Sequence, residues 1–187
     1  VLMYFDLDQF KTVNDTCGHS AGDALLRRFS TAVQSQLRSS DVLARLGGDE
    51  FCALLRNCPL PQALELAENI RARTAEHRFT WQQRSFSIST SIGVLSLEPG
   101  IDDVGEALNA ADHACYQAKE AGRNRVRLWR PDDRLQPARQ SELHWLARLN
   151  NAFDARRFRL LGQRIQPLAA AQSRRMVEVL LLMEDEP

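Results

Sequence analysis

The chain has 187 residues, which is enough for one domain with a sizeable core and part of a second. Its 24 basic and 24 acidic residues give a formal net charge of zero, which excludes a general electrostatic attraction toward nucleic acid or an anionic membrane. No apolar run approaches the roughly 20 residues that span a bilayer. We therefore expect no nucleic-acid binding and no membrane contact from these residues, and any recognition of phosphate must be local.

The sequence begins at Val1, inside an apolar run, with neither an initiator methionine nor a signal peptide. We expect a piece of a longer cytoplasmic protein, with an upstream membrane anchor as an open alternative. The cysteines lack CxxC or Cys/His metal spacing, which favours free thiols in a reducing compartment over disulfides or a metal site. They are Cys17, Cys52, Cys58 and Cys115.

The first predicted strand is the apolar run at residues 1–5, and its apolar residues on both faces are typical of a central strand. Asp6 and Asp8 follow it and share one face of the extended chain. They lie at the carboxyl end of the strand, where α/β sheets usually bind ligands. Residues 24–37 repeat apolar side chains at helical spacing, which predicts a helix packed on the sheet.

Two adjacent glycines followed by two adjacent acids stand at residues 47–50, between two apolar runs. Gly47 and Gly48 predict a tight two-residue turn, because glycine accepts a positive φ without steric cost. Asp49 and Glu50 are consecutive in an extended segment and are expected to point to opposite faces. The bare glycines leave room for a bulky anionic ligand at the tip of this hairpin.

Later elements complete one sheet. A helix is predicted at residues 61–77, a half-buried strand at 86–94, a helix at 102–121 and a closing strand at 126–129. The order of strand, helix, hairpin, helix, strand, helix and strand predicts an α/β (α+β) fold, a palm-like central sheet with flanking helices.

Three segments follow from this pattern. Residues 1–130 form the first predicted domain, and the charged, proline-containing residues 131–140 form a linker. Residues 141–187 begin an incomplete second domain, with a helix followed by strands at 158–165 and 177–183.

Four motifs in the first domain resemble the diguanylate cyclase family that is named for its GGDEF motif. They read FDLDQFK at residues 5–11, NDTCGHSAGD at 14–23, GGDEF at 47–51 and KEAGRN at 119–124. The resemblance covers about residues 1–130 and implies a nucleotidyl-cyclase-like fold that condenses two GTP into cyclic di-GMP and two pyrophosphates. It also implies a homodimer, because the hydroxyl of one GTP attacks the α-phosphate of the other.

Phosphoryl transfer of this kind needs divalent metal ions to neutralise the triphosphate, and Mg²⁺ prefers carboxylate, phosphate and water oxygens. The resemblance implies Mg²⁺, with Mn²⁺ as an alternative, held by Asp6, Asp49 and the carbonyl of Leu7. Glu50 would hold a second metal ion and help to deprotonate the ribose 3′ hydroxyl. The alternative for Asp6 is an ordinary surface acid at a strand end.

Asn14 and Asp23 match the residues of the family that read guanine, and the donor and acceptor pattern of the base suits an amide and a carboxylate. Both residue types are also good helix N-caps, so capping is the alternative. His19 matches a histidine near the nucleotide, with a structural role as its alternative. Gly47 and Gly48 of the hairpin complete the predicted substrate contacts.

Lys119 and Arg123 resemble the phosphate-binding pair of the family. Their spacing of four predicts one face of a helix end, where a solvated basic face is the alternative. The sequence contains only one other lysine, Lys11, which fits the first motif but could equally pair with a neighbouring acid.

Arg38 and Asp41 form an RxxD sequence ahead of the hairpin. In the family, RxxD at this offset is the inhibitory site that binds the product, so the resemblance implies feedback inhibition by cyclic di-GMP. The alternative is an exposed salt bridge, which typically contributes less than about 1 kcal/mol.

The second domain resembles the opening of an EAL-type cyclic di-GMP phosphodiesterase, through FRLLGQRIQP at residues 158–167 and EVLL at 178–181. Its metal-binding glutamate would be Glu178, but Leu182 stands where that family usually has arginine. An amphipathic C-terminal extension is the alternative.

The cyclase family normally has a helix and an Asp-x-Leu-Thr-x-Leu-x-Asn-Arg segment before its first strand, and this sequence starts after that segment. Whether these residues alone catalyse the reaction therefore stays open. The alternative function is a catalytically silent module that binds GTP or cyclic di-GMP and regulates an attached EAL phosphodiesterase domain.

Overall fold

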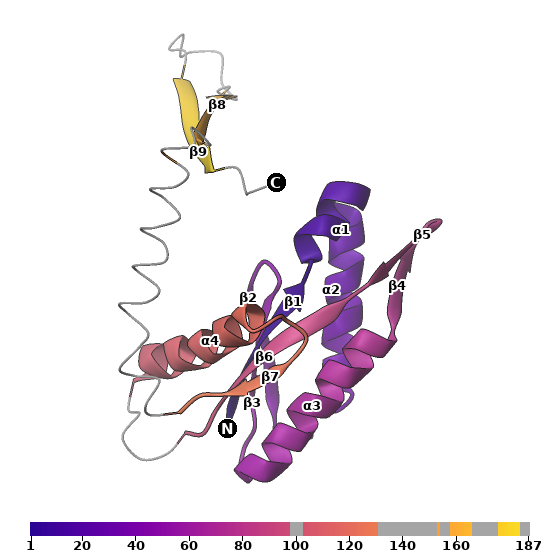
Figure 1. The fold of residues 1–187 in the computed structure, drawn as a ribbon, viewed down its shortest axis with the longest axis vertical. Helices are drawn as coiled ribbons and strands as arrows, with labels where there is room; N and C mark the ends of the chain where they lie inside the picture. The colour runs from indigo at the N-terminus through magenta and orange to yellow at the C-terminus, as the bar shows by residue number, and fades with distance from the viewer. Residues whose placement is uncertain (98–102, 131–152, 154–157, 166–175, 184–187) are drawn as a thin grey trace. The chain divides into compact units, whose positions relative to one another are not determined.

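The computed structural model describes residues 1–97, 103–130, 153, 158–165 and 176–183. The chain divides into two compact units, Val1–Asp133 and Arg134–Pro187, each of which is described by itself (Figure 1). No helix within the described ranges is both long and apolar enough to cross a membrane.

A five-stranded sheet in the order β2-β3-β1-β6-β7 organises the first unit. The predicted central strand is confirmed: β1 pairs antiparallel with β3 on one side and with β6 on the other. The strands are β1 (Leu2–Asp8), β2 (Val42–Gly47), β3 (Glu50–Leu54), β6 (Ser89–Leu95) and β7 (Val126–Leu128).

Four helices flank this sheet (Figure 1), as the predicted fold class requires. They are α1 (Phe10–Cys17), α2 (His19–Gln34), α3 (Leu60–Glu76) and α4 (Val104–Glu120). The sequence did not predict α1, because Val13 is its only buried residue and so short a helix shows no apolar repeat. Gly18, with φ 81°, separates it from α2, which begins five residues before the predicted start at residue 24.

The strand predicted at residues 86–94 is two strands. Residues Arg84–Ser87 form β5, which pairs with β4 (Arg78–Trp81) in a separate hairpin, whereas β6 pairs with β1. The alternating pattern runs through both strands, so it could not reveal that the pairing partner changes at Ile88.

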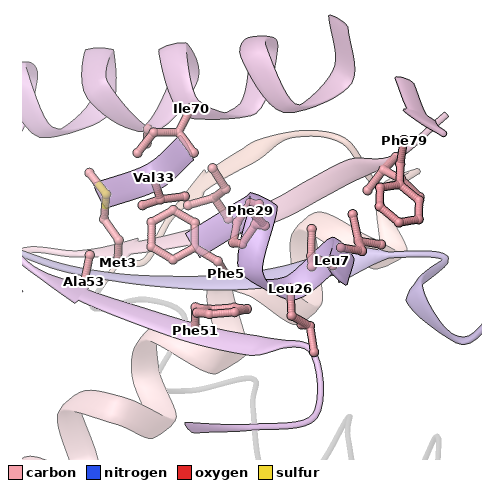
Figure 2. Packing of buried hydrophobic residues seen from close by; sticks show 14 of the residues in the cluster. Met3, Phe5, Leu7, Leu26, Phe29, Val33, Phe51, Ala53, Ile70 and Phe79 are labelled. Carbon is pink, nitrogen blue, oxygen red and sulfur yellow. The ribbon is translucent and has the colours of Figure 1, made fainter. Parts of the chain in front are cut away.

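The two faces of β1 bury different side chains. Met3, Phe5 and Leu7 pack against α2 and α3, in a cluster that includes Phe29 and Ile70 (Figure 2). The rings of Phe5 and Phe29 meet edge to face at 6.2 Å between centroids. Burial of this apolar surface is the main stabilising contribution to the unit.

The other face of β1 lies under α4, where Leu2 and Tyr4 pack with Cys115. The helix rests directly on the sheet at Gly93, since a Cβ there would stand 2.0 Å from the carbonyl oxygen of Ala111. Because side chains alternate along a strand, Asp6 and Asp8 also lie on this face.

The second unit contains an antiparallel pair, β8 (Phe158–Ile165) and β9 (Met176–Met183), at the positions where strands were predicted. Glu178 lies opposite Gln163 in this pair. The predicted linker at residues 131–140 and the helix expected from residue 141 lie outside the described residues. All four cysteines are free thiols, as predicted.

Candidate functional site

The hairpin between β2 and β3 has its turn one residue later than predicted. Gly47 belongs to β2, and the turn consists of Gly48, with φ 47°, and Asp49. A register shift between Arg45 and Gly47 absorbs the difference. The Nε and Nη2 groups of Arg45 donate to the carbonyl oxygen of Gly48 at 3.1 and 2.7 Å, which holds the turn closed.

Asp49 is anchored to the central strand through its backbone, because the amide of Leu7 donates to the carbonyl oxygen of Asp49 at 3.4 Å. Asp49 is a turn residue, so strand alternation does not determine the direction of its side chain relative to that of Glu50, and the opposite orientation of the two acids stays a prediction. Both carboxylates raise the pKa of a group beneath α4: Asp49 raises the pKa of Asp6, and Glu50 raises the pKa of Tyr4.

Asp6 is the centre of the site. It is 6% exposed, and its Cα pairs across the sheet with Glu50 of β3 and Ser91 of β6. Burial raises the pKa of Asp6 to about 6, although Lys119 lowers it, and the carboxylates of Asp49 and Asp8 raise it further. Asp6 is therefore a buried carboxyl among acids, and the alternative of an ordinary surface acid was wrong.

Lys119 lies in the last turn of α4 and reaches down to the sheet. Its Nζ atom lies 2.5 Å from Oδ2 of Asp6. Burial lowers the pKa of Lys119, but the ion pair with Asp6 outweighs this and leaves the pKa raised. The lysine is a half-buried partner of an acid, so the alternative of a solvated basic face was wrong for Lys119.

The spacing of Lys119 and Arg123 predicted that both lie on one face of the helix, but Arg123 lies beyond the end of α4. The helix ends at Glu120, and Gly122, with φ 111°, turns the chain. The amide of Gly122 donates to the Lys119 carbonyl and that of Arg123 to the Ala118 carbonyl, which together form a Schellman motif. Arg123 is exposed beyond this motif, with φ 58°.

Asn14 and Asp23 lie inside helices, so helix capping was the wrong alternative for both. The N-cap positions of α1 and α2 are Gln9 and Gly18. The Oδ1 atom of Asn14 is buried and has no hydrogen-bond partner in the described part of the chain. It lies against Gly22, where a Cβ would stand 2.0 Å away.

Asp23, the next residue of α2, is exposed at a hollow of about 840 Å³ between α2 and β2. Arg45, which holds the hairpin turn, lines the same hollow. Asp23, one of the two residues predicted to read guanine, thus lies beside the hairpin predicted to approach the phosphates. His19 is exposed at the first position of α2.

Asp41 uses its carboxylate to close its own turn. It accepts from the backbone amides of Arg38 at 3.0 Å and of Arg56 at 3.2 Å, and from the Ser40 hydroxyl at 3.3 Å. Among the residues with described positions, no ion pair joins Arg38 to Asp41, so the surface salt bridge was the wrong alternative. The Arg38 residue is exposed on the closed turn.

Two groups near the site carried no prediction. The pKa of Tyr4 is raised by burial and by the nearby carboxylates of Asp112 and Glu50. Loss of hydration and the Glu50 carboxylate raise the pKa of Asp112 on α4. No local signal identifies either residue, because α4 and β3 are brought together only by the fold.

The donors suit a hard divalent cation in their chemistry. The backbone pairing brings Asp6, Asp49 and Glu50 together with the backbone of Leu7. The pKa of Asp6 is raised mainly by burial, which Lys119 does not fully offset, and to a smaller extent by the neighbouring carboxylates of Asp49 and Asp8. No three acids, histidines or cysteines are already arranged as a metal site within the described ranges. Glu178 is the sole acid in β8 and β9, so the second unit offers no ligand set there.

The sequence profile described as "Diguanylate cyclase, GGDEF domain" matches residues 1–125. The probable diguanylate cyclase DgcE of Escherichia coli is 44% identical over 130 residues, which are 70% of this chain and 12% of that protein. The cyclic di-GMP phosphodiesterase PdeB of Shewanella oneidensis is 32% identical over 182 residues, 97% of this chain and 21% of that protein. The chain thus spans only a small part of either relative.

Solved structures agree with the sequence match. The isolated GGDEF domain of TpbB (YfiN) from Pseudomonas aeruginosa is 36% identical, with a TM-score of 0.66 over 71% of this chain and 77% of that one. The coiled coil and GGDEF domain of DgcB from Caulobacter crescentus, in complex with c-di-GMP, is 28% identical. Its TM-score is 0.64, over 68% of each chain.

Proposed function

Because residues 1–125 make this chain a member of the GGDEF-domain diguanylate cyclase family, we propose that it condenses two GTP molecules into cyclic di-GMP and two pyrophosphates. One observation carries the proposal: Lys119 lies 2.5 Å from the buried Asp6, beside the Gly48–Asp49 turn. A cation and a cluster of acids are thus held together where a triphosphate and its metal ions would meet.

Asp6, Asp49, Glu50 and the carbonyl of Leu7 are the residues that would hold Mg²⁺, or Mn²⁺ in its place. When bound, the metal neutralises the triphosphate and lowers the pKa of the attacking ribose hydroxyl. Lys119, which pairs with Asp6 in the structure, would bind a phosphate oxygen of GTP in place of that carboxylate. Glu50 accepts the proton of the 3′ hydroxyl.

Guanine would be read by Asn14 and Asp23. A buried amide oxygen without a partner typically costs about 1–3 kcal/mol, so Asn14 gains a hydrogen bond when its amide turns to the base. The exposed Asp23 carboxylate accepts from the N1 and N2 donors of guanine. His19, Gly47 and Gly48 would make further contacts with the nucleotide. Arg123 would bind phosphate together with Lys119.

The reaction needs two chains, since one GTP must attack the other. We therefore propose a homodimer in which two half-sites face each other across a two-fold axis. We also propose a cytoplasmic location, because the proposed substrate GTP is found there and the free thiols suit a reducing compartment.

Product inhibition is proposed at Arg38 and Asp41. The closed turn supports it, because the Asp41 carboxylate fixes the backbone from which Arg38 projects. The c-di-GMP bound to DgcB supports product binding by this class of domain. A guanidinium fork suits a phosphodiester oxygen pair.

A second function is favoured by a separate observation: the match to PdeB extends over 97% of the chain, well beyond the cyclase profile. We propose that residues 141–187 begin an EAL-type phosphodiesterase domain, with Glu178 as a metal ligand. The cyclase domain would then either synthesise cyclic di-GMP or act as a silent nucleotide sensor for that domain.

The deciding experiment incubates the chain, and a form extended at its N-terminus, with GTP and Mg²⁺ and measures cyclic di-GMP and pyrophosphate. Product from wild-type protein, and none from Glu50→Gln at an unchanged GTP affinity, is the expected result. Tight GTP binding without product in either form would leave the sensor as the function. Absence of GTP binding would overturn the cyclase, and absence of both GTP and cyclic di-GMP binding would overturn the sensor as well.

A further inference from the structure

We propose that Asp8 is a positioning residue, which fixes the turn after α4 and thereby places Arg123 beside the triphosphate. This role rests on the proposed function, because Arg123 binds phosphate only if the chain binds GTP as proposed. Asp8 itself takes no part in the proposed chemistry.

Asp8 is the last residue of β1 and is 3% exposed. Its Oδ2 atom accepts from the Ser89 hydroxyl at 2.7 Å and from the backbone amide of Asn124 at 3.1 Å. Its Oδ1 atom accepts from the Ser91 hydroxyl at 2.8 Å. One buried carboxylate therefore joins β1, β6 and the turn that follows α4.

The backbone conformation of this turn needs stabilisation by contacts from outside the turn. Arg123 and Asn124 are consecutive non-glycine residues with φ 58° and 47°, a left-handed conformation that side chains disfavour. The Schellman motif fixes the amide of Arg123, whereas the amide of Asn124 donates to Asp8. The Asn124 side chain is held separately, since its Oδ1 atom accepts from Nη1 of Arg71 at 2.8 Å.

Each of the two acids of β1 thus positions one of the two cations proposed to bind phosphate. Asp6 pairs with the side chain of Lys119, and Asp8 holds the backbone next to Arg123. Both acids project from one face of one strand, so the strand sets the spacing of the two cations.

The test is a double-mutant cycle on the full 187-residue chain, with GTP and guanosine affinities measured by calorimetry in Mg²⁺. We expect Asp8→Ala to weaken GTP binding roughly tenfold, about the effect of losing one well-placed phosphate contact, and to leave guanosine binding unchanged. In an Arg123→Ala background the same substitution should have little further effect. Equal losses in both backgrounds, or an equal loss for guanosine, would overturn the proposal.

Two further variants separate the hydrogen bond from the charge. Asp8→Asn removes the charge but can still accept from Asn124 and Ser89 and donate to Ser91, so we expect it to keep most of the GTP affinity. An Asn124→Gly control keeps the backbone donor and the left-handed turn, and should bind GTP nearly as wild type does. If Asp8→Asn behaves like Asp8→Ala, the charge and not the hold on the turn is responsible.

A readout without nucleotide separates this inference from the proposed function. The amide proton of Asn124 should resonate downfield in wild type and Asp8→Asn, and move upfield in Asp8→Ala. The same upfield position in wild type would refute the hold on the turn. Failure of the wild-type chain to bind GTP, with the downfield resonance present, would refute only the phosphate role.

Discussion

Gly22 lies directly against the side-chain amide of Asn14, so close that a Cβ at Gly22 would stand 2.0 Å from Oδ1 and 2.9 Å from Cγ. The contact joins α1 to α2 at the proposed guanine site. It explains why the residue before Asp23 has no side chain, although glycine in a helix costs about 1 kcal/mol relative to alanine.

Gly22→Ala should displace Asn14 and weaken recognition of guanine. We expect the KM for GTP to rise roughly tenfold while kcat changes little, because the acids and Lys119 are untouched. Steady-state cyclase assays measure both constants, with Ser20→Ala on the same helix as the control. An unchanged KM would mean that Asn14 does not read the base from this position.

Metal binding should depend on the ionisation of Asp6. Since burial holds its pKa at about 6, Asp6 loses its ability to ligate a cation as the pH falls through that value. We expect Mn²⁺ affinity, measured by electron paramagnetic resonance, to fall between pH 7 and pH 5. Asp6→Asn should bind weakly at every pH, and a wild-type affinity that is flat across this range would contradict the assignment.

Folding stability should show the opposite dependence on pH. The pKa of Asp6 is about 6 in the folded chain, against 3.8 for an ordinary aspartate in water, so the folded state holds the proton more tightly. The stability contribution is present below the unfolded value and is lost as the pH rises through the folded one. The loss is at most about 3 kcal/mol.

Urea denaturation of wild type and Asp6→Asn between pH 4 and pH 7 measures this contribution as the difference between the two variants. We expect the free energy of unfolding of wild type to fall relative to that of Asp6→Asn over this range. A constant difference would show that Asp6 titrates normally in the folded chain.

Arg38→Ala should relieve product inhibition without loosening its turn. The Asp41 carboxylate accepts from backbone amides, which the substitution keeps. We expect the cyclic di-GMP concentration for half inhibition to rise at least tenfold with an unchanged melting temperature, whereas Asp41→Ala lowers the melting temperature as well. Inhibition curves and thermal melts test both, and an unaltered curve for Arg38→Ala would remove it from the inhibitory site.

Much of the fold was readable from local pattern. The apolar run before Asp6 predicted the central strand, and the fold class is confirmed. The short α1 and the division between β5 and β6 were missed, because each depends on which surface a segment meets and not on its own periodicity. Ser89 and Ser91 were part of the polar half of an alternating strand, yet they donate to the buried Asp8.

The sequence by itself determined the family, because each of the four motifs is continuous along the chain and can be recognised without the three-dimensional structure. Only the tertiary structure decided how these strings act together. Strand register and the packing of α4 bring Lys119 onto Asp6 and the turn after α4 onto Asp8, contacts between residues far apart along the chain. Such contacts depend on geometry summed over several elements, which no local pattern of side chains encodes.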